Sequence, residues 1–293
     1  CSLLYGFSGS TNFEIIQQNI TTTSTGVVFA MVFILVGLAF KISAVPFHMW
    51  TPDVYEGSPS SVTSFFAIIP KIAGIAVFIR FIQIPFGDLT IHWQTILIFI
   101  SLASMILGAV AAIGQVNLKR LIAYSSIGHM GYALAGVATG TVSGYSYTIL
   151  YISIYVVMNI GIFGCLFLMK KDGKYCQDIK DLSGSSDAHP LISISLLIIL
   201  FSLAGIPPFA GFFAKFYIFL AVIENEMYTL AIIGLLSTVI SAFYYLKIIK
   251  TIYFDEIKNL SISGSIIISC FILSLFFLYP AILNNVLGNL IIN

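Results

Sequence analysis

Long apolar runs are the feature that most limits the folds open to this chain. A helix needs about 20 consecutive apolar residues to cross the ~30 Å hydrocarbon core of a bilayer. Backbone polar groups in lipid must find their hydrogen bonds inside the protein, so such runs predict helices. We therefore predict an all-α, polytopic membrane helix bundle with about eight transmembrane helices. The runs cover residues 26–50, 62–83, 93–116, 119–138, 144–170, 190–221, 227–252 and 262–286.

Composition and spacing indicate that the whole chain, residues 1–293, is a single membrane domain. Charged residues make up 9% of it, whereas a soluble domain carries roughly 25%. The net charge of +1 favours neither a nucleic-acid partner nor an acidic one. Residues 1–25 are expected to form the end of a preceding helix and a polar loop. Residues 26–286 hold the spans, and 171–189 form a polar surface loop.

The lysines and arginines predict the orientation of the bundle. If the spans alternate in direction, nine lysines and arginines in loops or near the ends of spans fall on one face of the membrane, and only Arg80 falls on the other. Loops rich in lysine and arginine normally lie in the cytoplasm or matrix. We therefore expect the loop 171–189 on that side and residues 9–25 on the opposite side. The residues on the lysine-rich face are Lys119, Arg120, Lys170, Lys171, Lys174, Lys180, Lys247, Lys250 and Lys258.

Two of the predicted spans are interrupted. The run 190–221 would be roughly 48 Å long as one helix, and Pro207 and Pro208 lie in its middle. In the run 26–50, Pro46 follows Lys41. Proline removes a donor and frees a carbonyl, so both helices must break. Broken helices inside a membrane occur where they line a cavity, and in transporters a pair of them marks the ion site.

Three lysines lie within predicted spans. Lys71 is about 14 Å into its helix, and a lysine near the bilayer centre costs at least ~2.5–3.5 kcal/mol. Burial disfavours the charged form of a lysine, so such a group can exchange a proton. We expect Lys71 to relay protons; snorkelling to the interface, or bonding to freed carbonyls, are the structural alternatives. Lys41 and Lys215 lie near the breaks, and either relay or structural bonding would explain them.

Two histidines are further candidates. His129 lies eleven residues into its span, and an imidazole is a suitable connector between two lysines because it titrates near pH 6.5. The alternative is a buried histidine whose bonds are simply satisfied. His48 ends the first run beside Trp50, where it could be a gate or an interfacial group.

Other polar residues in the spans carry weaker predictions. Ser125 and Ser126 could hold water, although serines in helices usually bond their own backbone. Tyr244 and Tyr245 lie near a predicted helix end and are expected to be interfacial aromatics. The sequence contains no phosphate-binding loop, metal-binding motif or nucleophile elbow, so no cofactor or metal is expected in this chain.

Four motifs together resemble one known family, the antiporter-like membrane subunits called chain 2 or N-type. These belong to proton-pumping NADH:ubiquinone oxidoreductase, respiratory complex I. "HMWTPDVYEG" is more similar to the N-type than to the M- and L-type subunits. "FKISAVPFHMW" and "PKI" are more similar to mitochondrial than to chloroplast versions. The motifs occupy residues 40–59, 70–81, 117–132 and 202–219.

The resemblance implies two inverted repeats, each with a broken helix, and proton translocation driven by quinone reduction in other subunits. The family's relay lysines correspond to Lys41, Lys71 and Lys215, and its histidine to His129. The chain would be a subunit of the enzyme without a redox centre of its own. FMN, Fe–S clusters and ubiquinone are expected in partners, among them the M-type and K-type subunits. The mitochondrial inner membrane is the expected location, with a bacterial plasma membrane as the alternative.

The chain resembles only the C-terminal part of the family's length, with the N-terminal helices missing. None of its acidic residues lies in the core of a span, although a buried lysine needs a partner. We therefore expect a separate chain to supply helices and a glutamate near Lys41 or Lys71, unless the sequence is merely truncated. Two other functions remain open: a subunit of an Mrp-type cation/proton antiporter, or a structural scaffold that moves no protons.

Overall fold

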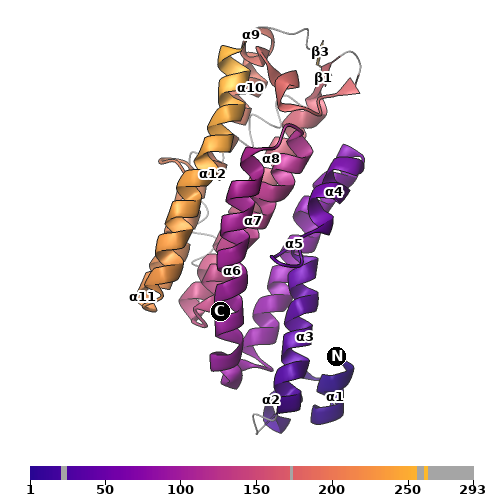
Figure 1. Ribbon diagram of the computed structural model, residues 1–293, viewed down its shortest axis with the longest axis vertical. Helices are drawn as coiled ribbons and strands as arrows, with labels where there is room; N and C mark the ends of the chain where they lie inside the picture. Colours follow the sequence, from indigo (N-terminus) through magenta and orange to yellow (C-terminus); the bar gives the residue numbers. More distant parts are fainter. Residues whose placement is uncertain (21–24, 172–173, 256–260, 263–293) are drawn as a thin grey trace.

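The computed structural model describes residues 1–20, 25–171, 174–255 and 261–262. Within them the chain is an elongated bundle of helices, with a small sheet at one end (Figure 1). The helices are α1 (Ser2–Ser8), α2 (Phe13–Asn19), α3 (Thr25–Lys41), α4 (Trp50–Gly57), α5 (Ser60–Gln83), α6 (Thr90–Ile113), α7 (Leu118–Ala138), α8 (Val142–Leu168), α9 (Ser185–Ala188), α10 (Pro190–Ala204), α11 (Ala210–Glu224) and α12 (Tyr228–Phe254).

The predicted membrane spans are largely present as helices. Four are long and apolar enough to cross a bilayer, namely Ser60–Gln83, Gly87–Ile113, Val142–Leu168 and Tyr228–Phe254. The other helices of the bundle are α7 and two interrupted pairs. Apart from the first residue of its range, the expected span 262–286 lies outside the described residues, so the structure does not establish the expected number of eight.

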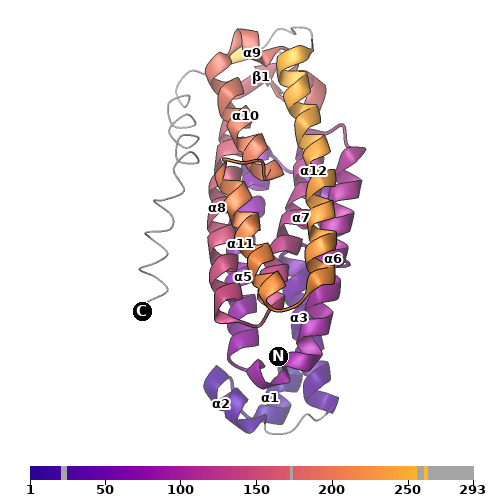
Figure 2. The same ribbon diagram turned by 90° about the vertical axis from the view of Figure 1, so that its left-hand side faces the viewer.

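Both predicted helix breaks are confirmed. The run 190–221 divides into α10 and α11, with Pro207 and Pro208 between them. In the run 26–50 the helix ends at Lys41, and after a non-helical linker the second half-helix, α4, begins at Trp50. The two broken helices run in opposite directions, since α3 leads up to α4 and α10 leads down to α11 (Figures 1 and 2). This antiparallel pair is the arrangement that an inverted repeat requires.

Helix α7 is the centre of the bundle, and nearly every one of its residues is buried. It packs most extensively on α6 and also touches α4, α5, α8 and α11. The contact with α6 is close because Gly108 faces Gly128, and a side chain at Gly108 would meet the backbone of Gly128. Small residues at such crossings let helices approach closely in membranes. Side chains on α7 therefore reach several neighbouring helices at once.

The polar connections carry more regular structure than the sequence predicts. Within the expected polar loop 9–25, α2 forms because the side chain of Asn12 accepts a hydrogen bond from the Glu14 amide at its start. In the loop region after α8, β1 (Met169–Lys171) pairs antiparallel with β2 (Lys174–Tyr175) and with β3 (Ser261–Ile262). Two short 3₁₀ helices, Gly87–Leu89 and Ile179–Leu182, complete the described connections.

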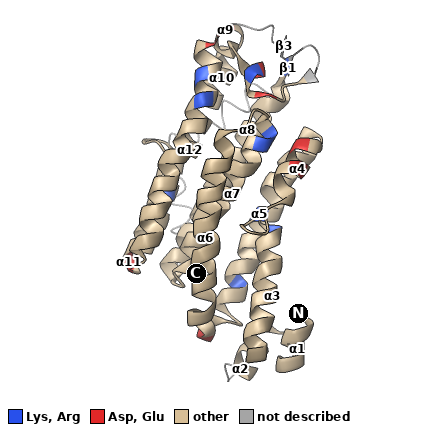
Figure 3. Ribbon diagram, in the orientation of Figure 1, with Lys and Arg blue, Asp and Glu red and all other residues tan. Residues whose placement is uncertain are grey.

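Basic residues gather at one end of the bundle, as the orientation argument predicts (Figure 3). We call this the basic end; α7 and α10 begin there, and α8 and α12 finish there. Arg80 lies in the last turn of α5, at the opposite end. The basic residues of this end that belong to described helices and loops are Lys119, Arg120, Lys170, Lys180, Lys247 and Lys250.

Candidate functional site

Lys71 is buried in the middle of α5, with 1% of its surface exposed. Its Nζ donates a 2.6 Å hydrogen bond to Oγ of Ser126 on α7. The Ser126 hydroxyl donates in turn to the carbonyl of Ala123 at 2.8 Å. The ring of Tyr55 on α4 lies 5.8 Å from the same Nζ. Lys71 therefore does not snorkel, and the partner that the sequence left unidentified is a hydroxyl on the central helix.

His129 lies on α7 and is also buried. Both nitrogens of its ring face tyrosine hydroxyls: Nδ1 is 2.6 Å from Tyr151 OH, and Nε2 is 3.1 Å from Tyr245 OH. The hydroxyl of Tyr245 is also 2.5 Å from Oγ of Ser125. A continuous chain of hydrogen bonds thus runs Ser125–Tyr245–His129–Tyr151, across helices α7, α12 and α8. His129 is fully satisfied, as the structural alternative predicted, but by groups that can carry protons.

The expectation that Tyr244 and Tyr245 are interfacial aromatics is wrong. Each has only 2% of its surface exposed, because α12 continues to Phe254 and places both tyrosines well inside the bundle. Sequence analysis missed Tyr245 as a site residue. One feature of the sequence could have pointed to this site: Ser125 and His129 are four residues apart on α7 and therefore share one face of the helix.

Lys215 is buried near the start of α11. Its Nζ donates to the carbonyls of Leu203 at 3.0 Å and Ala204 at 3.1 Å. These carbonyls end α10, where the left-handed residue Gly205 (φ 84°) stops the helix. The ring of Tyr132 lies 5.0 Å from Nζ. Lys215 therefore bonds carbonyls freed by the break, as the sequence allowed, and it stays close to the aromatic cluster around His129.

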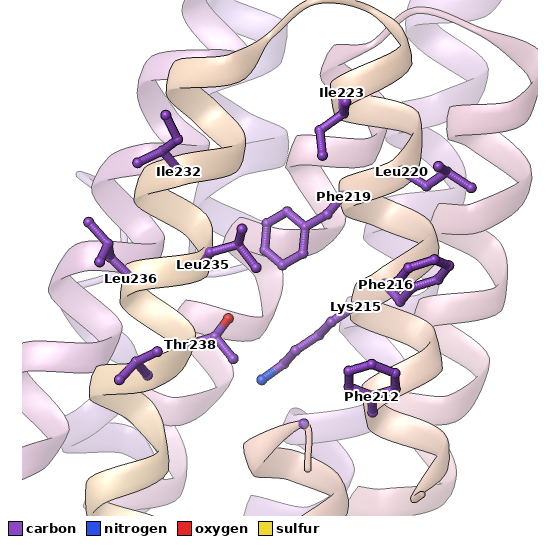
Figure 4. A pocket seen from close by; sticks show the side chains of 12 residues that line it. Phe212, Lys215, Phe216, Phe219, Leu220, Ile223, Ile232, Leu235, Leu236 and Thr238 are labelled. Atoms are coloured by element: carbon purple, nitrogen blue, oxygen red, sulfur yellow. The ribbon is translucent and has the colours of Figure 1, made fainter. Parts of the chain in front are cut away.

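A cavity of about 590 Å³ lies beside Lys215, between α11 and α12. Figure 4 shows the lysine side chain extending into the space between these two helices. Apart from Lys215, Thr238 and Gly205, the lining is apolar, so the ammonium is the charged group at this cavity. The apolar lining residues are Phe212, Phe216, Phe219, Leu220, Ile223, Ile232, Leu235, Leu236 and Val239.

The structure does not bring Lys41 and His48 into this cluster. Lys41 ends α3 and is exposed, whereas Lys71 and Lys215 are buried. At this break the carbonyl of Phe40 accepts a 3.1 Å bond from the amide of Ser43 and a 3.0 Å bond from the indole of Trp50. His48 lies partly exposed in the linker between α3 and α4. The cluster therefore consists of Lys71, His129 and Lys215: Lys71 bonds Ser126 and Lys215 lies beside the ring of Tyr132, three residues before and three residues after His129 on α7.

A second polar group ties α4 to the start of α7 at the basic end. Arg120 forms ion pairs with Asp53 at 2.7 Å and Glu56 at 2.8 Å. Lys119 donates to the carbonyl of Ser58 at 2.8 Å. From the sequence, Lys119 and Arg120 could serve only as indicators of orientation, because the acidic partners of Arg120 are more than 60 residues away in the chain. These contacts hold the second half of the first broken helix against the central helix.

No metal centre is found among the described residues, since nowhere in those ranges do three His, Cys, Asp or Glu side chains come together. The cluster itself offers amines, an imidazole and hydroxyls. All of these groups can take up or release a proton.

Comparison with known proteins identifies the family. The family model described as "NADH:quinone oxidoreductase/Mrp antiporter, TM" matches residues 1–241. NADH-quinone oxidoreductase subunit N of Pelagibacter ubique is 63% identical over 288 residues, which cover 96% of this chain and 61% of that protein. Subunit N 1 of Rhizobium meliloti is 55% identical over 258 residues, covering 87% of this chain and 54% of its own length.

Solved structures share the fold. A chain of respiratory complex I from Thermus thermophilus superimposes with a TM-score of 0.83 at 28% identity, covering 98% of this chain and 63% of that one. A chain of the Mrp complex from Dietzia sp. also gives a TM-score of 0.83, covering 98% of this chain and 62% of that one. At 21% identity the second likeness shows the fold alone.

The chain spans 61% and 54% of the length of the two curated relatives. Both relatives are bacterial, so the mitochondrial origin expected from the sequence is not supported. The comparisons also give no support to a separate chain that supplies further helices. The N-type resemblance itself agrees with the names of the relatives. The chain belongs to the NADH:quinone oxidoreductase/Mrp antiporter transmembrane family.

Proposed function

We propose that this chain is the N-type membrane subunit of a bacterial NADH:quinone oxidoreductase and translocates protons through Lys71, His129 and Lys215. The observation that carries the proposal is the burial of two lysines on either side of a hydrogen-bonded histidine in one membrane bundle. Intramembrane ionisable residues are costly and commonly mark proton or ion pathways.

The partners of the two lysines suit proton exchange. Lys71 donates to a serine hydroxyl and Lys215 to two carbonyls. A buried ion pair would hold the ammonium charged, because losing its proton would leave a carboxylate without a partner. A neutral acceptor imposes no such cost. Each lysine can therefore lose a proton without leaving an unpaired carboxylate behind, and can regain one later.

Two further features suggest where protons reach Lys71. Within the described residues, the hydroxyls of Ser43 and Thr51 are buried without a hydrogen-bond partner. Buried polar groups of this kind normally bond to ordered water. At the basic end a cavity of about 780 Å³ is bounded in part by Glu56 and Lys119, next to the start of α5. We place the proton entrance along α4, between this cavity and Lys71.

The relatives suggest the membrane and the partner subunits of this chain. The basic end, including residues 174–189, would face the cytoplasm of a bacterium, following the rule for positive charge. The exposed Lys41 would join the relay from the side of the first break, and His48 would act there as a gate. Other membrane subunits of the complex, including the M-type and K-type, would be partners. FMN, Fe–S clusters and quinone would be held by other subunits.

Two other functions fit less well. An Mrp-type antiporter subunit shares the fold, but the solved Mrp chain is 21% identical whereas the Pelagibacter subunit N is 63% identical. A scaffold without transport would have no use for two buried lysines, each costing at least ~2.5–3.5 kcal/mol near the bilayer centre. Copurification with flavin and Fe–S subunits would separate the first alternative from the proposal.

The test replaces Lys71 with methionine in the assembled complex, reconstituted in vesicles. The change removes the amine and keeps most of the side-chain volume. We expect NADH-driven proton uptake to fall roughly 10²-fold, the usual cost of removing a proton-transfer group. Lys71→Arg should fail as well, because arginine stays charged and cannot release a proton. Lys247→Met, at an exposed lysine of α12, is the matched control. Normal pumping by an assembled Lys71→Met complex would refute the proposal.

A further inference from the structure

The hydroxyl of Tyr245 occupies a position that none of the predicted relay residues fills. It lies 3.1 Å from Nε2 of His129 and 2.5 Å from Oγ of Ser125. Ser125 is the neighbour in sequence of Ser126, which binds the ammonium of Lys71. Tyr245 comes from α12, whereas both serines and the histidine belong to α7. A single hydroxyl from another helix therefore joins Oγ of Ser125 to the imidazole.

We propose that Tyr245 is a proton-relay residue, which passes protons between Ser125 and Nε2 of His129, while Tyr151 serves the other ring nitrogen. This inference rests on the proposed function of the cluster. It adds a residue on which the direction of transfer through the imidazole depends, because Nε2 is served by Tyr245 and Nδ1 by Tyr151.

The transfer balances without any charged tyrosine. The proton of the Tyr245 hydroxyl moves to Nε2 as the proton of the Ser125 hydroxyl moves to the oxygen of Tyr245. One O–H bond of Tyr245 breaks and another forms, so the phenol stays neutral, and the serine oxygen is reprotonated by hydronium, the co-reactant of the step. The product is an imidazolium with N–H bonds toward both tyrosines. It becomes neutral again by giving the Nδ1 proton to the oxygen of Tyr151 while the Tyr151 hydroxyl releases its own proton to water.

Other buried tyrosines around His129 do not have this connection. Tyr155 packs its ring against the imidazole, with centroids 5.2 Å apart, but its hydroxyl points to the carbonyl of Ala67 at 3.5 Å. The hydroxyl of Tyr132 accepts a 2.9 Å bond from Thr238. The role is thus assigned to Tyr245 by its bonds, since burial and aromatic packing are shared by all of these tyrosines.

The first arm of the test is Tyr245→Phe in the reconstituted complex. The ring and its packing are kept, and only the bridging hydroxyl is lost. We expect proton pumping per NADH to fall at least roughly tenfold, at the lower end of the effects of lost proton-transfer groups. Tyr145→Phe is the matched control, because Tyr145 is buried near the start of α8 and its hydroxyl is outside the chain Ser125–Tyr245–His129–Tyr151. An assembled Tyr245→Phe complex that pumps normally would overturn the inference.

The second arm distinguishes a relay from a merely structural hydroxyl. Incorporating 3,5-difluorotyrosine at position 245 keeps the hydroxyl but makes it more acidic. A relay residue should then shift the pH profile of pumping, whereas the same replacement at position 145 should leave the profile unchanged. This arm also decides the matter if Tyr245→Phe fails to assemble, and an unshifted profile would count against the inference.

The two proposals can fail separately. If Lys71→Met abolishes pumping while Tyr245→Phe pumps normally, the relay through the lysines stands and the role of Tyr245 is wrong. If both variants pump normally, the proposed function of the cluster is wrong, and the inference fails with it.

Discussion

The break between α3 and α4 and the break between α10 and α11 both interrupt a helix inside the bundle, and both use proline and serine residues to do so. Each contains a proline after a cis peptide bond, Val45–Pro46 in the first and Pro207–Pro208 in the second. Each also has a backbone amide that a serine hydroxyl satisfies. Ser104 accepts from Val45, and Ser202 accepts from Gly211, both at 2.9 Å. The two breaks therefore share their hydrogen-bond chemistry.

They differ in the placement of the lysine. Lys41 is the last residue of the half-helix before its break and is exposed. Lys215 lies on the half-helix after its break and reaches back to the last carbonyls of α10. Lys41 ends α3, and the ammonium of Lys215 lies at the last carbonyls of α10. Each lysine thus brings a cation to the negative end of a half-helix, where a cation is favoured. Within the described bundle, therefore, the lysine of the second break is hydrogen-bonded and the lysine of the first break is not.

The largest expected difference between the breaks comes from removing each lysine. Lys215→Met deprives two buried carbonyls of their donor, and each such loss costs about 1–3 kcal/mol. We therefore expect a clear fall in the unfolding temperature of the complex, together with a roughly 10²-fold loss of pumping. Thermal unfolding and proton uptake of the same preparation measure the two effects.

Lys41→Met is the partner experiment. We expect it to leave the unfolding temperature close to that of the parent, because no hydrogen bond of Lys41 is found within the described residues. If Lys41→Met destabilised the complex as much as Lys215→Met, the distinction between the two breaks would be wrong.

A smaller effect should be shared by the two breaks. Ser104→Ala leaves the amide of Val45 without its acceptor, and Ser202→Ala does the same to Gly211. Because both bonds are buried, each change should cost about 1–3 kcal/mol. Chemical denaturation of the two variants checks the prediction. A loss confined to one variant would show that the breaks are not equivalent in their serine contacts.

The smallest predicted effect concerns the ion pairs that hold α4. Arg120→Ala removes the contacts to Asp53 and Glu56, whose side chains are 73% and 41% exposed. Exposed pairs contribute only about 0.2–1 kcal/mol. Lys250→Ala removes an exposed pair with Asp255 at 3.5 Å that holds no half-helix, and is the control. We expect Arg120→Ala alone to lower pumping measurably, and equal effects would argue against a role for the clamp.

Much of the bundle could be predicted because apolar length and proline act locally. The proline positions in 26–50 and 190–221 sufficed to predict both breaks, and the depth of Lys71 in its run sufficed to predict its burial. The gathering of basic residues at one end followed from counting lysines and arginines. Each of these features depends on a short segment and on the bilayer alone.

The contacts of the site could not be predicted in the same way. Ser126 is 55 residues from Lys71, and Tyr245 is 116 residues from His129. Which helices meet at α7 depends on close packing such as that of Gly108 against Gly128, and no periodicity in the sequence records it. Tyr244 and Tyr245 were misplaced because their burial depends on the packing of α12 against other helices, which are distant in sequence.

The account's central claim is that Lys71 and Lys215 belong to one proton path through His129. Two groups in series on one path show non-additive effects, because either loss alone blocks the path. The decisive measurement is proton uptake per NADH in vesicles containing Lys71→Met, Lys215→Met and the double variant. We predict that each single variant loses nearly all pumping that depends on this chain, and that the double variant loses no more. Partial losses that add up in the double variant would show two independent paths and contradict the account.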